Sequence, residues 1–391
     1  MRIAFYAPLK APDHPTPSGD RRMGRLILAA LELARHDVFV ASELRAYCAT
    51  PQPARQGAIR DAAEAEVQRI IAAAETPPDI WFTYHVYYKA PDWIGPKVAA
   101  HFGIPYIVAE ASHAPKRAEG PWAIGHAGVE QAIAAAAAVI NLTRLDRAMV
   151  EPLLTAPGES VYLPPFLDTD PFTAAADDAA VHRAGLEGAL GLDPDSRWLL
   201  SVAMMRGGAK LESYQALGEV LAAVKSDRWK LIVVGDGPER AVVEAALAPA
   251  GDRVVYAGER PVEALPAIYA ACDLYVWPAV HEAYGMALLE AQAAGTAVVA
   301  GRVRGVPDVV EEGAGGMLAP EGDPVALAGL IDLMLEDETE RKELGRLARN
   351  LVSRQRNLHQ AAMAIDGVLQ RTHLHHDRAP EPEPVRQDEA P

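Results

Sequence analysis

Residues 277–295, which read WPAVHEAYGMALLEAQAAG, decide the fold class of this chain. An apolar strand pattern ends at Trp277 and a polar loop follows it. A helical pattern then begins near Gly285 and ends at Gly295, a residue type suited to a helix C-cap. A strand that passes through a short loop into a helix is the repeating unit of a parallel sheet covered by helices. This stretch therefore predicts an α/β protein.

The start of this predicted helix has the chemistry of an anion site. A glycine there lets the backbone approach a ligand closely, and the free amides of the first turn carry the positive end of the helix dipole. Carboxylates accept hydrogen bonds from hydroxyl groups, so acidic residues on either side suit a ligand with hydroxyl-rich groups flanking its phosphates. We expect the phosphates at the amides near Gly285, Met286 and Ala287, between Glu282 and Glu290.

The alternation of strands and helices extends along the chain in both directions from this stretch. A Pro-, Asp- and Ala-rich segment from residue 164 to about residue 195 interrupts it and is typical of a linker. We therefore predict two Rossmann-like doubly wound α/β domains, whose ligands bind beyond the carboxyl ends of the strands, in the cleft between the domains. The predicted strands are Ile3–Ala7, Val38–Ala41, Ile80–Thr83, Tyr106–Ala109, Ala138–Asn141, Val161–Leu163, Trp198–Ala203, Lys230–Val234, Val254–Ala257, Leu274–Trp277 and Ala297–Ala300.

A second loop supplies positive charge. The strand pattern at Trp198–Ala203 leads into a loop that carries Arg206 and Lys210, and a helical pattern follows. Arginine grips phosphate with a forked pair of donors, and lysine adds a mobile point charge. These two cations could neutralise a diphosphate leaving group as charge builds on it. We therefore expect no metal ion and no cofactor in this chemistry.

A third loop, Gly235-Asp-Gly-Pro238, also follows a predicted strand. Alone it is a weak signal, because the same residues occur in ordinary turns. Arg240 stands where the third glycine of a G-x-G-x-x-G pattern would be, which weighs against a dinucleotide-binding dehydrogenase.

Taken in order, these loops resemble the retaining family 4 glycosyltransferases, which have the GT-B fold. The similarity covers roughly residues 196–320 and includes the Glu282-x7-Glu290 spacing with Tyr284-Gly-Met. The N-terminal half is similar more loosely, through its first strand, Ser18-Gly19 and the segment Leu163-Pro-Pro-Phe-Leu-Asp168.

The resemblance implies a role for each site residue. Glu290 would hold the ribose of the donor and Glu282 the transferred sugar, while Arg206 and Lys210 would hold the diphosphate. Gly19 would lie beside the donor. The family has a histidine in the N-terminal domain that touches the sugar, and His113 matches it best, with His85 as the rival.

The resemblance also divides the chain. It implies an N-terminal acceptor domain over residues 1–167, a donor domain over residues 168–354 and a helix over residues 355–371 that crosses back to the N-terminal domain. The composition of residues 372–391, rich in Pro, Glu, Asp and His, predicts a disordered tail.

The segment from Lys10 to Arg25 is basic and follows the first strand. Its prolines and Gly19 predict a shaped loop that overhangs the cleft. We expect Arg21 and Arg22 to face an anionic acceptor, such as a phospholipid-linked or uronic sugar, or the surface of an anionic membrane. The alternative is that these arginines serve local ion pairs or the donor phosphates.

Charge and cysteine usage narrow the class of protein. A net charge of −16 weighs against non-specific nucleic-acid binding, which needs a basic surface. Two cysteines in 391 residues do not make a disulfide framework, so a reducing compartment is favoured. The first residues read as a strand and not as a signal peptide. We therefore expect a cytoplasmic protein, with peripheral contact at the inner face of the membrane as a further hypothesis.

The function predicted from the sequence is transfer of a sugar, with retention of configuration, from a nucleotide-diphosphate sugar to an acceptor that is a glycolipid, a polysaccharide or a small molecule. Two alternatives remain open. One is a nucleotide-sugar epimerase or hydrolase of the same architecture, and the other is a non-catalytic subunit that binds a sugar nucleotide.

Overall fold

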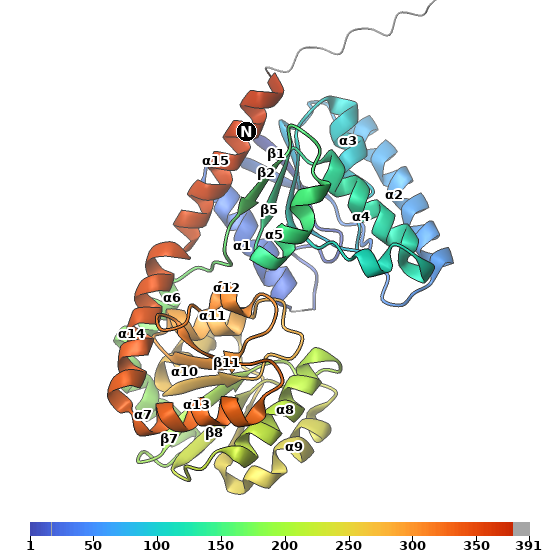
Figure 1. The fold of residues 1–391 in the computed structure, drawn as a ribbon. Helices are drawn as coiled ribbons and strands as arrows, with labels where there is room; N and C mark the ends of the chain where they lie inside the picture. The colour runs from blue at the N-terminus through green and yellow to red at the C-terminus, as the bar shows by residue number, and fades with distance from the viewer. Residues whose placement is uncertain (17, 378–391) are drawn as a thin grey trace, which may run out of the picture.

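The computed structural model describes residues 1–16 and 18–377, which form two parallel six-stranded sheets (Figure 1). The first sheet has the strand order β2-β1-β3-β4-β5-β6 and the second β12-β11-β10-β7-β8-β9. The prediction of two doubly wound α/β domains is confirmed. The strands are β1 (Arg2–Tyr6), β2 (Asp37–Ser42), β3 (Ile80–Val86), β4 (Tyr106–Ala111), β5 (Ala138–Asn141), β6 (Glu159–Tyr162), β7 (Arg197–Val202), β8 (Trp229–Val234), β9 (Val254–Gly258), β10 (Leu274–Trp277), β11 (Ala297–Gly301) and β12 (Gly316–Ala319).

Helices lie between the strands and cover both sheets (Figure 1). No helix in the described part of the chain is long and apolar enough to cross a membrane. The α-helices are α1 (Gly19–Leu33), α2 (Pro53–Ala73), α3 (Gly95–Phe102), α4 (Ala123–Ala135), α5 (Arg144–Val150), α6 (Asp170–Asp177), α7 (Ala179–Leu190), α8 (Ala209–Ala223), α9 (Arg240–Leu247), α10 (Leu265–Ala271), α11 (Met286–Ala293), α12 (Val306–Val309), α13 (Pro324–Glu336), α14 (Glu338–Gln355) and α15 (Leu358–Asp377).

The central strands explain why the sheets are parallel. All six residues of β4 and all four residues of β10 are buried. A strand buried on both faces reads as a continuous apolar run, and such strands occur in sheets that helices cover on both sides. The carboxyl ends of these strands then provide the edge from which the loops of each domain extend.

The structure differs from the prediction in two segments, the predicted linker over residues 164–195 and the strand β12. Residues 164–195 contain α6 and α7, because Asp170 and Pro171 occupy the first turn of α6, where acidic residues and proline favour a helix start. The short strand β12 was not predicted, since its four residues stand between Gly315 and Pro320.

The predicted loop between Lys10 and Arg25 is also corrected. The helix α1 begins at Gly19, because the Ser18 side chain caps it by accepting a hydrogen bond from the Arg21 amide at 3.2 Å. Arg21 and Arg22 therefore belong to the first turns of a helix and not to a loop.

The last helix, α15, lies against α1 of the N-terminal half (Figure 1). Asp366 of α15 pairs with His36 at 3.0 Å, and Arg371 pairs with Glu159 at 3.2 Å. The predicted tail from residue 372 is wrong as far as residue 377, because the helix continues to Asp377 and buries Thr372. Residues 378–391 of the predicted tail lie outside the described residues.

Packing of α15 should contribute measurably to stability. Ile365 is 1% exposed, and an Ile→Ala change at a buried site costs about 2–5 kcal/mol, so Ile365→Ala should lower the melting temperature clearly. Met363 lies two residues away on the same helix but is 70% exposed, so Met363→Ala is the matched control and should change little. Equal melting temperatures for the two variants would show that α15 does not stabilise the fold through this packing.

Candidate active site

Side chains from the two halves of the molecule meet where the carboxyl ends of the two sheets face each other. Arg22 of α1 forms an ion pair with Glu290 of α11. The Tyr284 hydroxyl, in the loop after β10, donates to Glu110 Oε2 of β4 at 3.3 Å. Glu290 and Arg22, two of the predicted site residues, therefore lie at the interface between the two halves.

The start of α11 has the geometry expected of an anion site. Gly285 precedes the helix with φ +82°, a conformation that other residues rarely adopt. A Cβ at this position would lie 2.8 Å from Leu288 Cδ1. Among the described residues, the amides of Met286 and Ala287 have no hydrogen-bond acceptor. These two amides are free to receive an anion at the positive end of the helix.

Glu282 and Lys210 are brought together beside this turn. Lys210 Nζ lies 2.5 Å from Glu282 Oε2, and the Trp277 indole N–H donates to the same oxygen at 3.2 Å. Both charged side chains are mostly shielded from solvent. A cation and a carboxylate thus stand next to each other at the carboxyl end of β10, where a phosphate and a sugar hydroxyl would each find a partner.

Arg206 is placed differently from Lys210. Its side chain is exposed, and it forms no hydrogen bond or ion pair with any other described residue. The turn that carries it is held by the Gly235–Pro238 loop, because Gly237 packs so closely on Met205 that a Cβ would lie 2.3 Å from the Met205 carbonyl oxygen. Arg206 is therefore an unpaired cation on a rigid support.

Glu290 is buried, with 4% of its surface exposed. Its carboxylate accepts a hydrogen bond from the Tyr269 hydroxyl at 2.9 Å and pairs with Arg22 through the other oxygen. Burial raises the pKa of Glu290, and the positive charge of Arg22 opposes that shift. Arg22, predicted to face the acceptor, instead contacts the residue predicted to hold the donor ribose.

His85 lies at the centre of a buried polar network. Its Nδ1 is 3.3 Å from Asp20 Oδ1 and 3.7 Å from Glu110 Oε1. Both His85 and Glu110 have positive φ, at 63° and 60°, and such strained backbone at the ends of strands is concentrated at functional sites. Burial would lower the pKa of His85, but Glu110 and Asp20 outweigh it and raise the pKa to about 9.

This raised pKa predicts a pH-dependent contribution to stability. His85 carries its proton in the folded protein up to about pH 9, whereas its ordinary value is 6.5. The contribution, on the order of 1–3 kcal/mol, should be fully present below pH 6.5 and lost as the pH rises through about 9. The difference in unfolding free energy between wild type and His85→Gln should therefore shrink as the pH is raised. A difference that stays constant across this range would contradict the assignment of charge to His85.

The remaining predicted residues make contacts within the N-terminal half. Gly19 is the first residue of α1, and Arg21 Nη1 donates to the His14 carbonyl at 2.7 Å. This contact fits the alternative in which the arginines serve local structure. His113 follows β4, and its Nε2 lies 3.1 Å from Glu130 Oε1 of α4, so the ring faces α4.

Sequence reasoning gave no role in the site to Asp20, Glu110 or Tyr284. Their one available signal was position, since each stands at the carboxyl end of a predicted strand or in the loop that follows. No sequence pattern predicts the left-handed backbone conformation of His85 and Glu110.

Comparison with solved structures gives the fold. The structure is similar to sucrose-phosphate synthase from Thermosynechococcus elongatus, with a TM-score of 0.74, 18% identity and coverage of 96% of this chain and 99% of that chain. It is also similar to Anabaena HepE in complex with UDP-glucose, with a TM-score of 0.70, 19% identity and coverage of 95% and 100%. The chain has the GT-B fold, as predicted.

Sequence comparison finds a family similarity in the second half of the chain. Residues 207–351 match the family model described as glycosyl transferases group 1. The predicted recognition of this group is confirmed; membership of family 4 and retention of configuration stay predictions.

Named relatives match parts of the chain. Over 248 residues it is 32% identical to a D-inositol 3-phosphate glycosyltransferase from Xylanimonas cellulosilytica, covering 61% of this chain and 58% of that protein. Over 150 residues it is 37% identical to the 2-deoxystreptamine glucosyltransferase of Streptomyces kanamyceticus, covering 38% of each. The matched segments span less than two thirds of the length of either relative.

Proposed function

We propose that this protein is a retaining glycosyltransferase that moves a sugar from a nucleotide-diphosphate sugar to an acceptor. The observation that carries the proposal is the pairing of Lys210 with Glu282 beside the free amides at the start of α11, with the exposed Arg206 four residues before Lys210. Two cations and a helix N-terminus suit a diphosphate, and a neighbouring carboxylate suits a sugar hydroxyl. Anabaena HepE, whose fold is similar, forms a complex with UDP-glucose, which supports the same class of donor.

In this proposal each residue acts at a defined part of the donor. Arg206, Lys210 and the amides of Met286 and Ala287 stabilise the charge that develops on the leaving diphosphate. Glu282 positions the transferred sugar. The acceptor hydroxyl attacks the anomeric carbon on the face from which the diphosphate leaves, and the departing phosphate oxygen takes the hydroxyl proton.

Glu290 receives the ribose hydroxyls in the same proposal. A buried carboxylate needs a partner, and Arg22 provides it in the present structure. When a donor binds, the ribose competes with Arg22 for this oxygen. Binding of the nucleotide is thereby coupled to a contact between the two domains.

The acceptor side is proposed to lie on the N-terminal domain, near His85 and Arg21. The names of two relatives refer to a cyclitol phosphate and an aminocyclitol. Burial lowers the pKa of Lys10, Asp20 opposes that shift, and the cations Arg45, Arg206 and Arg21 lower it further, so cations outnumber the one carboxylate at this place. A phosphorylated or otherwise anionic polyol is the first acceptor to test. Peripheral contact with an anionic membrane remains a proposal for the same basic residues.

The proposal is tested by incubating the protein with UDP-, GDP- and ADP-sugars, with and without a set of polyol acceptors. The expected result is acceptor-dependent release of nucleoside diphosphate, with the product linkage retaining the anomeric configuration of the donor in NMR spectra. Release without any acceptor would instead favour the epimerase or hydrolase alternative. Donor binding without turnover for every acceptor would favour a non-catalytic subunit.

Donor binding is expected to be independent of Mg²⁺ and Mn²⁺. Arg206, Lys210 and the start of α11 already supply the positive charge that a metal ion would provide. The affinity for the nucleoside diphosphate, measured by calorimetry, should be the same in EDTA as in excess Mg²⁺. Loss of binding or turnover in EDTA that Mg²⁺ or Mn²⁺ restores would refute this prediction.

A further inference from the structure

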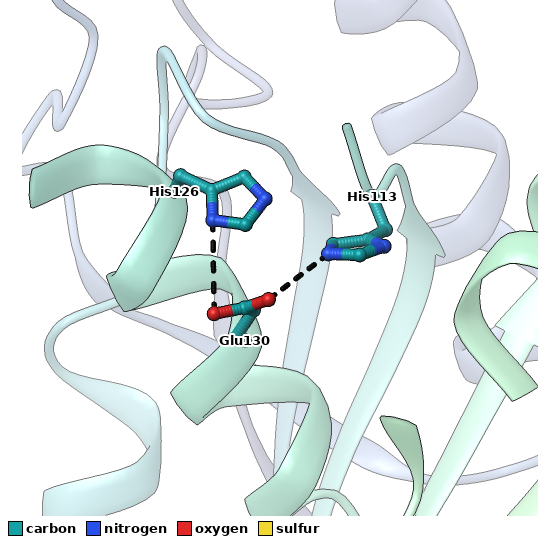
Figure 2. A group of neighbouring side chains, drawn as sticks. All are labelled: His113, His126 and Glu130. Carbon is teal, nitrogen blue, oxygen red and sulfur yellow. Dashed lines mark hydrogen bonds and ion pairs between the residues drawn. The ribbon is translucent and has the colours of Figure 1, made fainter. Parts of the chain in front are cut away.

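A compact group of metal-ligating side chains lies outside the site described above. His113 follows β4, while His126 and Glu130 are four residues apart on α4 (Figure 2). His113 Nε2 lies 3.1 Å from Glu130 Oε1, and His126 Nδ1 lies 3.6 Å from Glu130 Oε2. The three ligand atoms all lie within 4.8 Å of one another.

These distances are close to those around a tetrahedral metal ion. With metal–ligand bonds of about 2.0–2.1 Å, two ligand atoms of a tetrahedron stand about 3.3 Å apart. The two measured separations, 3.1 Å to Glu130 Oε1 and 3.6 Å to Glu130 Oε2, lie on either side of that value, with each histidine facing a different oxygen of the carboxylate. Both imidazole rings direct a nitrogen at the same carboxylate (Figure 2), so only small side-chain adjustments would be needed.

The backbone holds His126 in place. Gly125 packs so closely on the loop after β3 that a Cβ would lie 2.1 Å from the Tyr88 carbonyl oxygen, and a Cβ at Gly128 would lie 2.5 Å from the Trp93 indole nitrogen. These contacts fix the first turns of α4 against the strand loops. A ligand pair at positions i and i+4 on a fixed helix is preorganised on one face.

His126 is a buried side chain, with 2% of its surface exposed. Its Nδ1 faces Glu130 Oε2 at 3.6 Å, which is longer than a normal hydrogen bond. The nitrogen directed at Glu130 can therefore bind a further partner.

We propose that His113, His126 and Glu130 form a binding site for a divalent transition metal, with Zn²⁺ as the first candidate. Two imidazoles and one carboxylate are a ligand set that Zn²⁺ takes, and they disfavour Mg²⁺, which prefers oxygen ligands. The Glu130 side chain is 44% exposed, so a water molecule can complete the coordination from the solvent side. The ion ties the loop that begins after β4 to α4.

This site is independent of the proposed donor chemistry. None of its three ligands contacts Arg206, Lys210, Glu282 or Glu290 within the described residues. The ion would hold the loop after β4, next to Glu110, and would take no part in neutralising the diphosphate. It adds a metal to a chain for which the sequence predicted none.

The test is metal content and stability of the full chain, freed of any affinity tag. Wild-type protein dialysed against EDTA, then exposed to Zn²⁺ and desalted, should retain about one Zn²⁺ per chain by mass spectrometry. Co²⁺ in its place should give the visible absorption of a tetrahedral ion. His126→Gln and Glu130→Gln should each weaken Zn²⁺ binding by at least about tenfold, since even indirect partners of ligands cost 10–100-fold.

A matched control removes exposed histidines elsewhere. His375 and His376 are both exposed on α15, so the double variant His375→Gln, His376→Gln should bind Zn²⁺ like wild type. Zn²⁺ should also raise the melting temperature of wild type and of this control but not of Glu130→Gln. Failure of wild type to retain Zn²⁺, or equal retention by His126→Gln and Glu130→Gln, would overturn the proposal and leave a hydrogen-bonded triad. Should either ligand variant fail to fold, the wild-type stoichiometry and Co²⁺ spectrum still decide.

Discussion

Arg206→Ala is expected to slow sugar transfer by about 10²-fold while leaving the melting temperature unchanged. The side chain is exposed and makes no hydrogen bond or ion pair among the described residues, so its removal costs the fold little. In the proposed mechanism it stabilises charge on the leaving diphosphate, so its loss acts on the transition state. Steady-state kinetics should show a fall in kcat/KM with the donor, and weaker binding of the nucleoside diphosphate.

Arg260 provides a matched control for this substitution. It is also an exposed arginine just beyond a strand of the second sheet, but it follows β9 at the sheet edge. Arg260→Ala should leave the kinetics unchanged. Wild-type kinetics for Arg206→Ala, or an equal loss in both variants, would remove Arg206 from the donor site.

Glu282→Gln is expected to lower kcat by about 10²-fold, because the carboxylate both positions the sugar and pairs with Lys210 in the proposed mechanism. Glutamine keeps the size of the side chain and an oxygen for the Trp277 indole N–H, so the local fold should survive. The nucleoside diphosphate without its sugar should bind nearly as well as before. Unchanged nucleotide affinity with lower turnover would indicate a role toward the sugar. A role in stability would instead lower both.

The neighbouring carboxylate of Glu212 is the control for this change. Glu212 lies in the first turn of α8, and its Oε2 is 3.7 Å from Nε2 of His281, which precedes Glu282 in the loop after β10. The Glu212 side chain is exposed and was assigned no role toward the donor. Glu212→Gln should retain wild-type turnover. A Glu282→Gln enzyme that turns over as fast as Glu212→Gln would contradict the assignment of Glu282.

Much of the fold followed from local pattern. The strands β5 and β10 have the predicted bounds, because a buried parallel strand reads as an unbroken apolar run. The start of α1 was misplaced, since the prolines around residue 15 masked the Ser18 cap. The helices α6 and α7 were missed because capping residues resemble a linker in composition.

The candidate site could likewise be predicted only in part from the sequence. Lys210 was predicted in a loop but lies in the first turn of α8, and it meets Glu282 because parallel strands bring the segments that follow them to one edge. The contact between Arg22 and Glu290 joins positions 268 residues apart and depends on how the two domains meet. The grouping of His113 with Glu130 likewise depends on how α4 packs against the loops after β3 and β4. No local sequence pattern predicts contacts between residues so far apart in the chain.

The central claim, that the site binds a nucleotide-diphosphate sugar, is tested most directly by a thermal-shift screen of UDP-, GDP- and ADP-sugars. A donor present at 100 times its Kd stabilises the folded protein by about 2.7 kcal/mol, so at least one compound should raise the melting temperature of wild type. The same compound should give a clearly smaller shift with Arg206→Ala and a full shift with Arg260→Ala. If no nucleotide sugar shifts wild type, or if Arg206→Ala responds like wild type, the assignment of this site is contradicted.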